Sequence, residues 1–206
     1  MTVRIRDGAT VVFAGDSITD ATRTEGGPAL GAGYVLFAAA AHSARRPTSG
    51  IRWVNAGVSG NRVVDLEARW QRDVLAAAPD VVTVLIGIND VWRRYDRDSP
   101  TSAEQYRDGY RRLLASAVDN GVRELVLIEP FLIPVADQSR WREDLDPKIQ
   151  AVRELAREYG AHLLAADGAF AQLAARTGSE AWAEDGVYPT LAGHRVLADR
   201  WLDLVD

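Results

Sequence analysis

The sequence alternates short apolar runs with longer amphipathic stretches, and this alternation restricts the fold more than any other feature. The short runs consist mostly of β-branched residues and leucine and are apolar on both faces, as in parallel strands covered on both sides. The longer stretches carry apolar residues at the three-to-four spacing of helices. The predicted strands are 10–14, 51–55, 81–86, 124–128 and 161–166, and the predicted helices are 34–45, 65–78, 102–120, 142–159 and 191–204. This alternation predicts a three-layer α/β/α sandwich around a doubly wound, five-stranded parallel sheet of the flavodoxin-like kind.

Length and composition are those of an ordinary globular protein. A chain of 206 residues is predicted to form a single domain that spans residues 1–206. Hydrophobic residues make up 47% of the chain and charged residues 26%, a balance that argues against disorder and fibrous repeats. The 29 acidic and 24 basic residues leave a net charge of −5, which argues against a nucleic-acid partner.

Missing residue types and segments exclude further classes of function. Because the chain has no cysteine, disulfides, thiolate metal sites and cysteine nucleophiles are excluded. Three scattered histidines predict no metal site, and the segment after the first strand lacks a phosphate-binding pattern, so we expect no cofactor. We recognise neither a signal peptide nor an apolar run of about 20 residues, and therefore expect a cytoplasmic protein without a membrane partner. An apolar helix face and tryptophans would permit a homo-oligomer.

Polar and glycine-rich segments follow four of the five predicted strands, where ligands of such a sheet bind. They are GDSITD at 15–20, AGVSGN at 56–61, GINDVW at 87–92 and DGAF at 167–170. The first would place Ser17 at the start of a helical turn, whose N–H groups favour negative charge nearby. Each segment also has a plain alternative: Asp16 and Ser17 could cap that turn, Asp90 could cap the segment after it, and the glycines could form ordinary turns.

Four short blocks occur in one order along the chain. They are Gly-Asp-Ser-Ile at 15–18, Asn-x-Gly-x-x-Gly at 55–60, Gly-x-Asn-Asp at 87–90 and Asp-Gly-Val-x-Pro at 185–189. This order resembles that of the SGNH, or GDSL-type, serine hydrolases, and the likeness extends from Val11 to about Ala198. The connecting segments GAGYV, PDVVTVLIGINDVW and EPFLIP are similar to those of bacterial GDSL esterases and carbohydrate O-deacetylases.

The resemblance implies a role for each block. Ser17 would be the nucleophile, and its backbone N–H, that of Gly60 and the side-chain amide of Asn89 would form an oxyanion hole. Such preorganised donors are worth roughly 3 kcal/mol each in comparable sites. Asp185 would orient a histidine that takes the proton from the serine.

Tyr188 departs from this pattern, because it stands where the family has its histidine, three residues after Asp185. A phenol with a pKa near 10 is only about one part in a thousand ionised at pH 7, and a nearby carboxylate such as that of Asp185 would raise the pKa further. Tyr188 is therefore a poor general base, and we expect impaired activity. Three accounts remain: an introduced change, a natural loss that leaves a binding or structural protein, or a different chemistry with Tyr188 as donor or acid. The retained blocks favour the first.

Only three histidines could replace the missing one. His42 falls in the first long helix and His162 opens the fifth predicted strand, so neither is at a carboxyl end. His194 lies six residues after Tyr188 on the first turn of the last helix, about 10 Å further along a helical rise. A helix-start or surface histidine is the expected role of His194, and a substitute base would require a remodelled loop.

Aromatic and cationic residues in the predicted loops indicate the substrate class. They are Trp92, Arg93, Arg94, Tyr95, Phe131, Trp141 and Trp182. Trp92 follows the presumed oxyanion segment directly, and aromatic faces suit a sugar ring or a small acyl group. We expect a short acyl ester, first an O-acetylated carbohydrate, with Asp16 and Trp92 as candidate substrate contacts; small alcohol esters or an acyl thioester come next. The alternative is a catalytically inactive ester- or carbohydrate-binding protein on an esterase scaffold.

Overall fold

The predicted parallel sheet is present in the computed structural model, which describes residues 2–133, 135 and 138–206. Its strands are β1 (Thr10–Gly15), β2 (Arg52–Gly57), β3 (Val81–Leu85), β4 (Glu124–Ile128) and β5 (His162–Leu164). They pair in the order β2-β1-β3-β4-β5, and every pairing is parallel. The chain therefore builds outward from β1 in both directions, and the switch point of a doubly wound sheet lies between β1 and β3.

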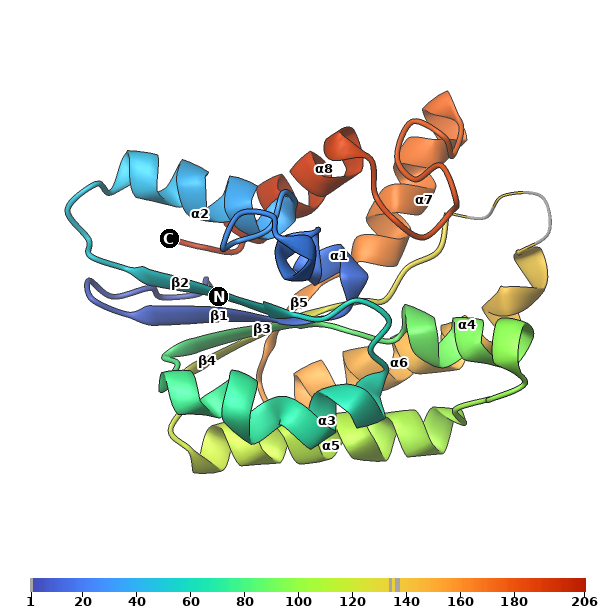
Figure 1. Cartoon of the computed structure of the whole chain (residues 1–206), viewed down its shortest axis with the longest axis horizontal. Helices are drawn as coiled ribbons and strands as arrows, with labels where there is room; N and C mark the ends of the chain where they lie inside the picture. Colours follow the sequence, from blue (N-terminus) through green and yellow to red (C-terminus); the bar gives the residue numbers. More distant parts are fainter. Residues whose placement is uncertain (1, 134, 136–137) are drawn as a thin grey trace.

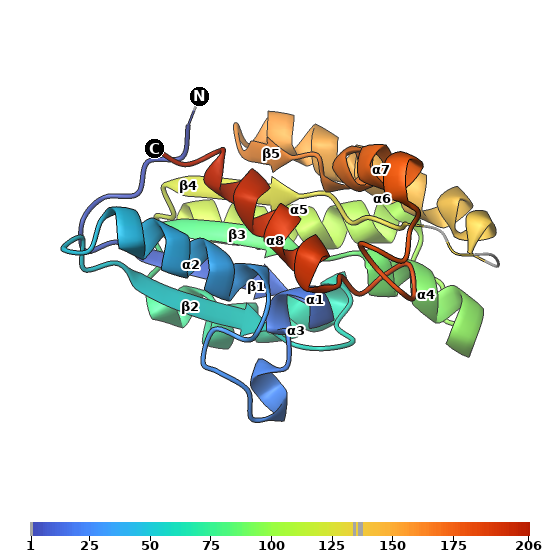
Figure 2. The same cartoon turned by 90° about the horizontal axis from the view of Figure 1, so that it is seen from above.

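Helices cover both faces of the sheet (Figure 1). The helices are α1 (Ser17–Asp20), α2 (Tyr34–Arg45), α3 (Val63–Asp73), α4 (Ile88–Arg97), α5 (Ala103–Asp119), α6 (Arg142–Glu158), α7 (Ala166–Thr177) and α8 (Leu191–Leu202), with 3₁₀ turns at η1 (Arg23–Glu25), η2 (Leu75–Ala77) and η3 (Ser139–Trp141). Helices α1, α2, α7 and α8 lie on one face, and α3 to α6 lie on the other. Seen from above, α2 and α8 lie side by side and α7 lies toward β5 (Figure 2).

Alternate side chains of the strands feed two hydrophobic cores. Val11 and Phe13 of β1 pack into the first, together with Trp201 of α8, while Val12 and Ala14 pack into the second against α3 and α5. This is why the strands are apolar on both faces. The two chain ends also meet, since the Val3 amide donates to the Leu204 carbonyl at 2.7 Å. Of the helices in the described part of the chain, none has both the length and the apolar character needed to cross a bilayer.

Two helices replace segments that we expected to be loops. The segment after β3 continues as α4, whose residues are mostly polar and whose buried face consists of only a few positions, among them Ile88 and Val91. The second is α7, which is rich in alanine and contains Gly168, so its sequence gives a weak helical pattern. It begins at Ala166 because β5 has only three residues. Only two residues separate β3 from α4, and only one separates β5 from α7, so neither place has a long loop.

Candidate active site

Ser17 lies at the carboxyl edge of the sheet, at the start of a helical turn as predicted. It is the first residue of α1 and is partly exposed. Asp16 caps the helix, because its carboxylate accepts the Ile18 N–H at 3.0 Å. Gly15 allows the turn, since a Cβ there would come within 2.2 Å of the Leu85 carbonyl oxygen. The N–H of Ser17 is among the first of the helix, which have no intrahelical partner, so it can point to an anion.

Gly60 and Asn89, the other two predicted oxyanion donors, belong to segments that touch. Gly60 lies in the connection between β2 and α3 and has a φ of +80°. Asn89 is the second residue of α4, and its Nδ2 donates to the carbonyl of Asn61 at 3.1 Å. The amide of Asn89 therefore lies against the connection that contains Gly60. The ends of β2 and β3 are brought together in this way.

Arg69 joins the same connection to the end of β1, a role that sequence analysis did not assign. This guanidinium is buried and donates to four acceptors: the Gly15 carbonyl at 3.0 Å, the Ala56 carbonyl at 2.7 Å, Asn61 Oδ1 at 2.6 Å and Asp73 Oδ2 at 3.4 Å. The sequence did carry a signal. Arg69 follows Leu66 by three residues, so it falls on the buried face of α3, where a cation requires acceptors.

Two buried carboxyl groups flank these elements. Burial raises the pKa of the Asp16 carboxyl to about 7, while the Ile18 N–H lowers it and Asp90 raises it. Burial likewise raises the pKa of Asp90 to about 7, against the hydrogen bond from Val63. Asp90 Oδ2 accepts the Val63 N–H at 3.0 Å, so Asp90 caps α3 rather than the segment that follows it. Asp16 is 1% exposed and caps α1, and the substrate contact expected for it stays a prediction.

Asp185 and Tyr188 form a turn before α8. Asp185 Oδ1 accepts the N–H groups of Val187 at 2.9 Å and Tyr188 at 2.7 Å. The pKa of the Tyr188 phenol is raised, as expected, but burial is the first cause and the carboxylates of Asp20 and Glu25 are the others. Asp185, which we expected to act, is not among these causes. The ring of Tyr188 packs against that of His194, whose Nδ1 accepts the Tyr34 N–H at the start of α2.

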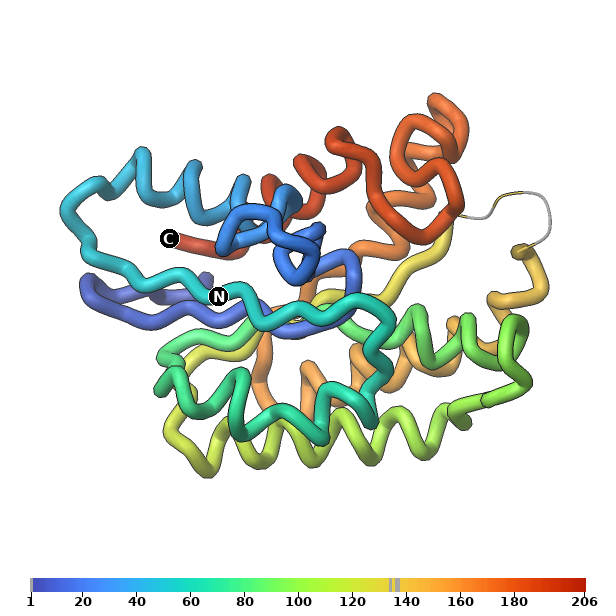
Figure 3. The backbone as a smooth tube through the Cα atoms, in the orientation of Figure 1, coloured from blue at the N-terminus to red at the C-terminus, as the bar shows by residue number. Residues whose placement is uncertain are grey.

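A cavity of about 430 Å³ opens beside this turn. Its lining consists of Glu184, Asp185, Tyr188, Pro189, Thr190 and Leu191. Figure 3 shows the segment that leads into α8 on the same face of the sheet as the segment that follows β1. The phenol of Tyr188 therefore borders a space large enough for a small ligand.

His194 is buried against α2 and is not a surface residue. Its Nδ1 accepts the Tyr34 N–H at 3.3 Å, and its ring meets the edge of Tyr188 at 5.3 Å between centroids. Burial lowers its pKa to about 4, so the ring is neutral at pH 7. An imidazole that accepts at Nδ1 carries its proton on Nε2, which leaves no basic nitrogen for a serine. His42 lies within α2 and His162 opens β5, as predicted. Across the residues that the structure describes, no three carboxylate or imidazole groups gather as a metal ion would require.

The aromatic residues expected around the site are largely part of the core. Phe131 is fully buried and Trp141 is 6% exposed, so neither is free to line a substrate site. Trp92 is half-buried on α4 rather than on a loop, and its ring packs on Trp141 at 5.5 Å. Trp182 is half-buried, and its Nε1 donates to Thr177 at 2.7 Å. Of the expected aromatic residues, Trp92, Tyr95 and Trp182 are partly exposed, and Tyr188 joins them as a candidate contact.

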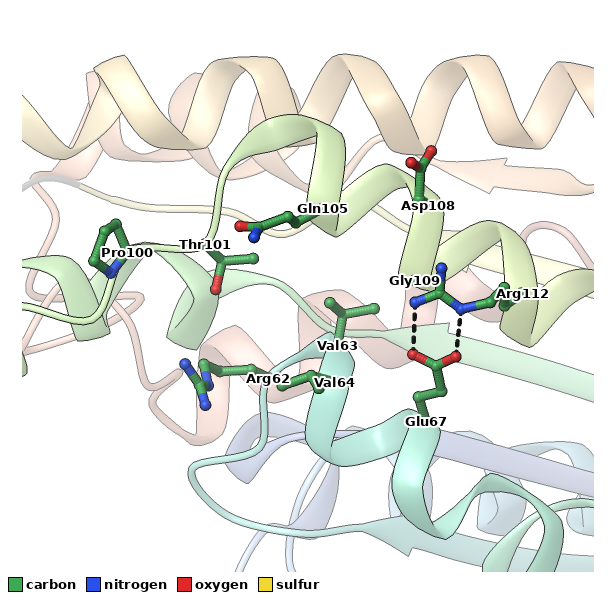
Figure 4. A pocket seen from close by; sticks show the side chains of 10 residues that line it. All are labelled: Arg62, Val63, Val64, Glu67, Pro100, Thr101, Gln105, Asp108, Gly109 and Arg112. Atoms are coloured by element: carbon green, nitrogen blue, oxygen red, sulfur yellow. Dashed lines mark hydrogen bonds and ion pairs between the residues drawn. The ribbon is translucent and has the colours of Figure 1, made fainter.

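A second cavity, of about 420 Å³, lies between α3 and α5 (Figure 4). It is lined by Arg62, Val63, Val64, Glu67, Pro100, Thr101, Gln105, Asp108, Gly109 and Arg112. The ion pair between Glu67 and Arg112 crosses it, with Arg112 Nη2 2.9 Å from Glu67 Oε2. Neither Ser17 nor Tyr188 borders this cavity, so it is separate from the candidate active site.

The chain is similar to known hydrolases in sequence and in structure. The sequence profile of the GDSL-like lipase/acylhydrolase family matches residues 13–196. The chain is 39% identical to an acetylxylan esterase of Geobacillus stearothermophilus over 97% of this chain and 95% of the relative. The crystal structure of Axe2, an acetylxylan esterase from the same organism, superposes with a TM-score of 0.90 at 36% identity, covering 98% of this chain and 95% of Axe2. LAE5, an α/β hydrolase enzyme from the metagenome of Lake Arreo, superposes with a TM-score of 0.89 at 36% identity, covering 97% and 96% of the two chains.

Proposed function

The chain belongs to the GDSL-like lipase/acylhydrolase family, and we propose that it is a serine esterase that removes acetyl and other short acyl groups from O-acylated carbohydrates. The identity of 39% to an acetylxylan esterase over nearly the whole chain supports the substrate class. The observation that carries the proposal is the meeting of the ends of β1, β2 and β3, which Ser17, Gly60 and Asn89 follow along the chain. Arg69 and the Asn89 amide hold the connection with Gly60 against the ends of β1 and β3.

Ser17 is the nucleophile in this proposal. Its Oγ bonds to the acyl carbon while its proton passes to a water molecule, which returns a proton to the sugar oxygen when that oxygen leaves. The carbonyl oxygen takes the electron pair of the C=O π bond and becomes an oxyanion held by the N–H groups of Ser17 and Gly60 and by Asn89 Nδ2. Collapse of this intermediate expels the sugar hydroxyl and leaves the acyl group on Ser17. Water then attacks the acyl-enzyme and releases the acid. A tetrahedral oxyanion forms twice, when Ser17 attacks the ester and when water attacks the acyl-enzyme. The dipole of α1 and the first N–H groups of that helix favour both.

Tyr188 limits the rate, because the reaction needs a group that takes the proton of Ser17. The raised pKa keeps its phenol protonated throughout the neutral range. Asp185 holds the backbone of the turn and has no imidazole to orient. His194 is neutral and uses Nδ1 for the Tyr34 N–H. We therefore propose that the chain turns over slowly at neutral pH, because the site has a nucleophile and oxyanion donors but lacks a general base.

The test compares this chain with Tyr188→His on p-nitrophenyl acetate and on acetylated xylo-oligosaccharides. An imidazole at position 188 should raise kcat/KM at least about 100-fold on both substrates, as a restored general base does. Tyr188→Phe is the matched control. It removes only the phenol hydroxyl, so the slow basal rate should not change if that hydroxyl is not the base.

Ser17→Ala separates the esterase from a binding protein. In the Tyr188→His background this change should abolish hydrolysis, while binding of an acetylated xylo-oligosaccharide persists. If Tyr188→His binds such oligosaccharides but does not hydrolyse them, the chain is a carbohydrate-binding protein on an esterase scaffold. If it hydrolyses p-nitrophenyl acetate but neither binds nor hydrolyses the oligosaccharides, the esterase assignment stands and the carbohydrate assignment is wrong.

A further inference from the structure

The guanidinium of Arg93 lies between the two oxyanion donors that come from different strand ends. Arg93 is one turn after Asn89 on α4, and its Nη2 is 3.4 Å from Asn89 Oδ1. The same nitrogen is 3.8 Å from the point that a Cβ on Gly60 would occupy. The side chain is 17% exposed. A cation thus stands at the site without a role in the proposed mechanism.

Arg93 fixes which way the amide of Asn89 faces. A guanidinium is only a donor, so the amide oxygen must face Arg93 and the NH₂ group must face away from it. On that other side the NH₂ donates to the Asn61 carbonyl at 3.1 Å and keeps its second hydrogen for a ligand. A flipped amide would set donor against donor at Arg93 and oxygen against oxygen at Asn61. Both neighbours therefore enforce one orientation, the one in which Asn89 can donate to an acyl oxygen.

Two neighbours hold the guanidinium in place. Nη1 forms an ion pair with Asp96, one turn further along α4. The guanidinium carbon is 5.9 Å from the centre of the Trp92 ring, within the range of a cation–π contact. Gly60 brings no side chain to this side, and a Cβ there would lie 3.8 Å from Nη2, at ordinary van der Waals contact. The guanidinium is therefore held beside the proposed oxyanion hole.

We propose that Arg93 is a positioning residue of the oxyanion hole, which holds the Asn89 amide in its donating orientation. This inference rests on the proposed function, since it assigns a role within that site. Arg93 acts through Asn89, so its contribution is to the transition state, in which the acyl oxygen is charged, more than to binding of the neutral ester.

The kinetic test uses the Tyr188→His background, in which turnover is measurable. Arg93→Met should lower kcat about 10- to 100-fold with little change in KM, and Asn89→Ala should lower it about 100-fold or more. The double variant should be no slower than Asn89→Ala, because Arg93 has nothing left to position. Arg94→Met is the matched control: Arg94 also lies on α4 but pairs with Asp144 at 2.7 Å, and its loss should leave kcat unchanged.

Additive losses in the double variant, or an unchanged kcat in Arg93→Met, would overturn the proposal. A second measurement on the present chain requires no turnover. The side-chain NH₂ signals of Asn89, assigned in NMR spectra by their loss in Asn89→Ala, should exchange slowly with solvent in the unchanged chain and in Arg94→Met. In Arg93→Met the slow exchange should be lost. Slow exchange retained in Arg93→Met contradicts the positioning role, whereas failure of Tyr188→His to hydrolyse any ester contradicts only the proposed function.

Discussion

Replacing Asp16 by Asn should make the free energy of unfolding less dependent on pH. The carboxyl of Asp16 is 1% exposed, and burial raises its pKa to about 7, whereas an aspartate in an unfolded chain titrates near 4. Between these values the folded state binds more protons than the unfolded state. Stability from this group is therefore complete below the unfolded pKa and is lost as the pH rises through the folded pKa.

The size of the effect follows from the two pKa values. With values of about 4 and about 7, a single carboxyl loses about 2.5 kcal/mol of folding free energy between pH 5 and pH 8. Asn keeps the oxygen that accepts the Ile18 N–H at 3.0 Å but does not titrate. The unchanged chain should lose about 2.5 kcal/mol more than Asp16→Asn over this interval. The raised pKa of Asp90 adds a similar slope to both proteins and cancels to first order in the comparison.

Urea unfolding at pH 5 and pH 8 measures this difference directly. The exposed Asp119, which lies at the end of α5 on the surface, supplies the control Asp119→Asn. This control should keep the pH dependence of the unchanged chain. Equal pH dependence in the unchanged chain and in Asp16→Asn would refute the reasoning, because it would mean that the buried carboxyl titrates as it does in the unfolded chain.

The remaining predictions concern Arg69 and the role of position 188 as a general base. Arg69→Met leaves two backbone carbonyls and the Asn61 oxygen without their donor, and we expect it to lower the unfolding free energy by about 3 kcal/mol in urea titrations; a loss below about 1 kcal/mol would show that water replaces this donor. The phenol of Tyr188 stays protonated between pH 6 and pH 8, so any pH dependence of the basal esterase rate of the unchanged chain in this range should follow Asp16 and Asp90, whose pKa values are raised to about 7, and not position 188. In Tyr188→His the rate should rise with an apparent pKa near that of an imidazole, about 6.5; parallel profiles would exclude position 188 as the base.

The sheet could be predicted from sequence because each strand is a continuous apolar run between turn residues. The run at 124–128 became β4 without any change of bounds, and the helix at 34–45 became α2 in the same way. The misassigned segments became α4 and α7. The apolar residues of α4 do stand at helical spacing, at Ile88, Val91, Trp92 and Tyr95, but they form a narrow stripe on a mostly polar helix, whereas α7 is rich in alanine and has only a weak pattern. Local pattern thus predicts the elements whose burial is nearly complete and misses those buried on a narrow face.

Site prediction reached the segments but not the contacts between them. Spacing and resemblance selected Ser17, Gly60 and Asn89, whose segments do meet. Two contacts could not be found from the sequence. Asp90 caps α3 through Val63, which is 27 residues away, and His194 accepts a hydrogen bond from Tyr34, which is 160 residues away and whose N–H occupies the nitrogen that a general base would need. Such pairs are set by the topology of the sheet, which joins distant strand ends at one edge.

The central claim is that Ser17 becomes acylated by the ester, and that an oxyanion hole formed from three strand ends stabilises this step. The most direct measurement is a crystal structure of Tyr188→His after reaction with a p-nitrophenyl phosphonate, whose phosphorus mimics the tetrahedral acyl carbon. We predict a covalent bond to Ser17 Oγ and a phosphoryl oxygen within about 3 Å of the N–H groups of Ser17 and Gly60 and of Asn89 Nδ2. An unmodified Ser17, or a phosphoryl oxygen that points away from Gly60 and Asn89, would contradict the account.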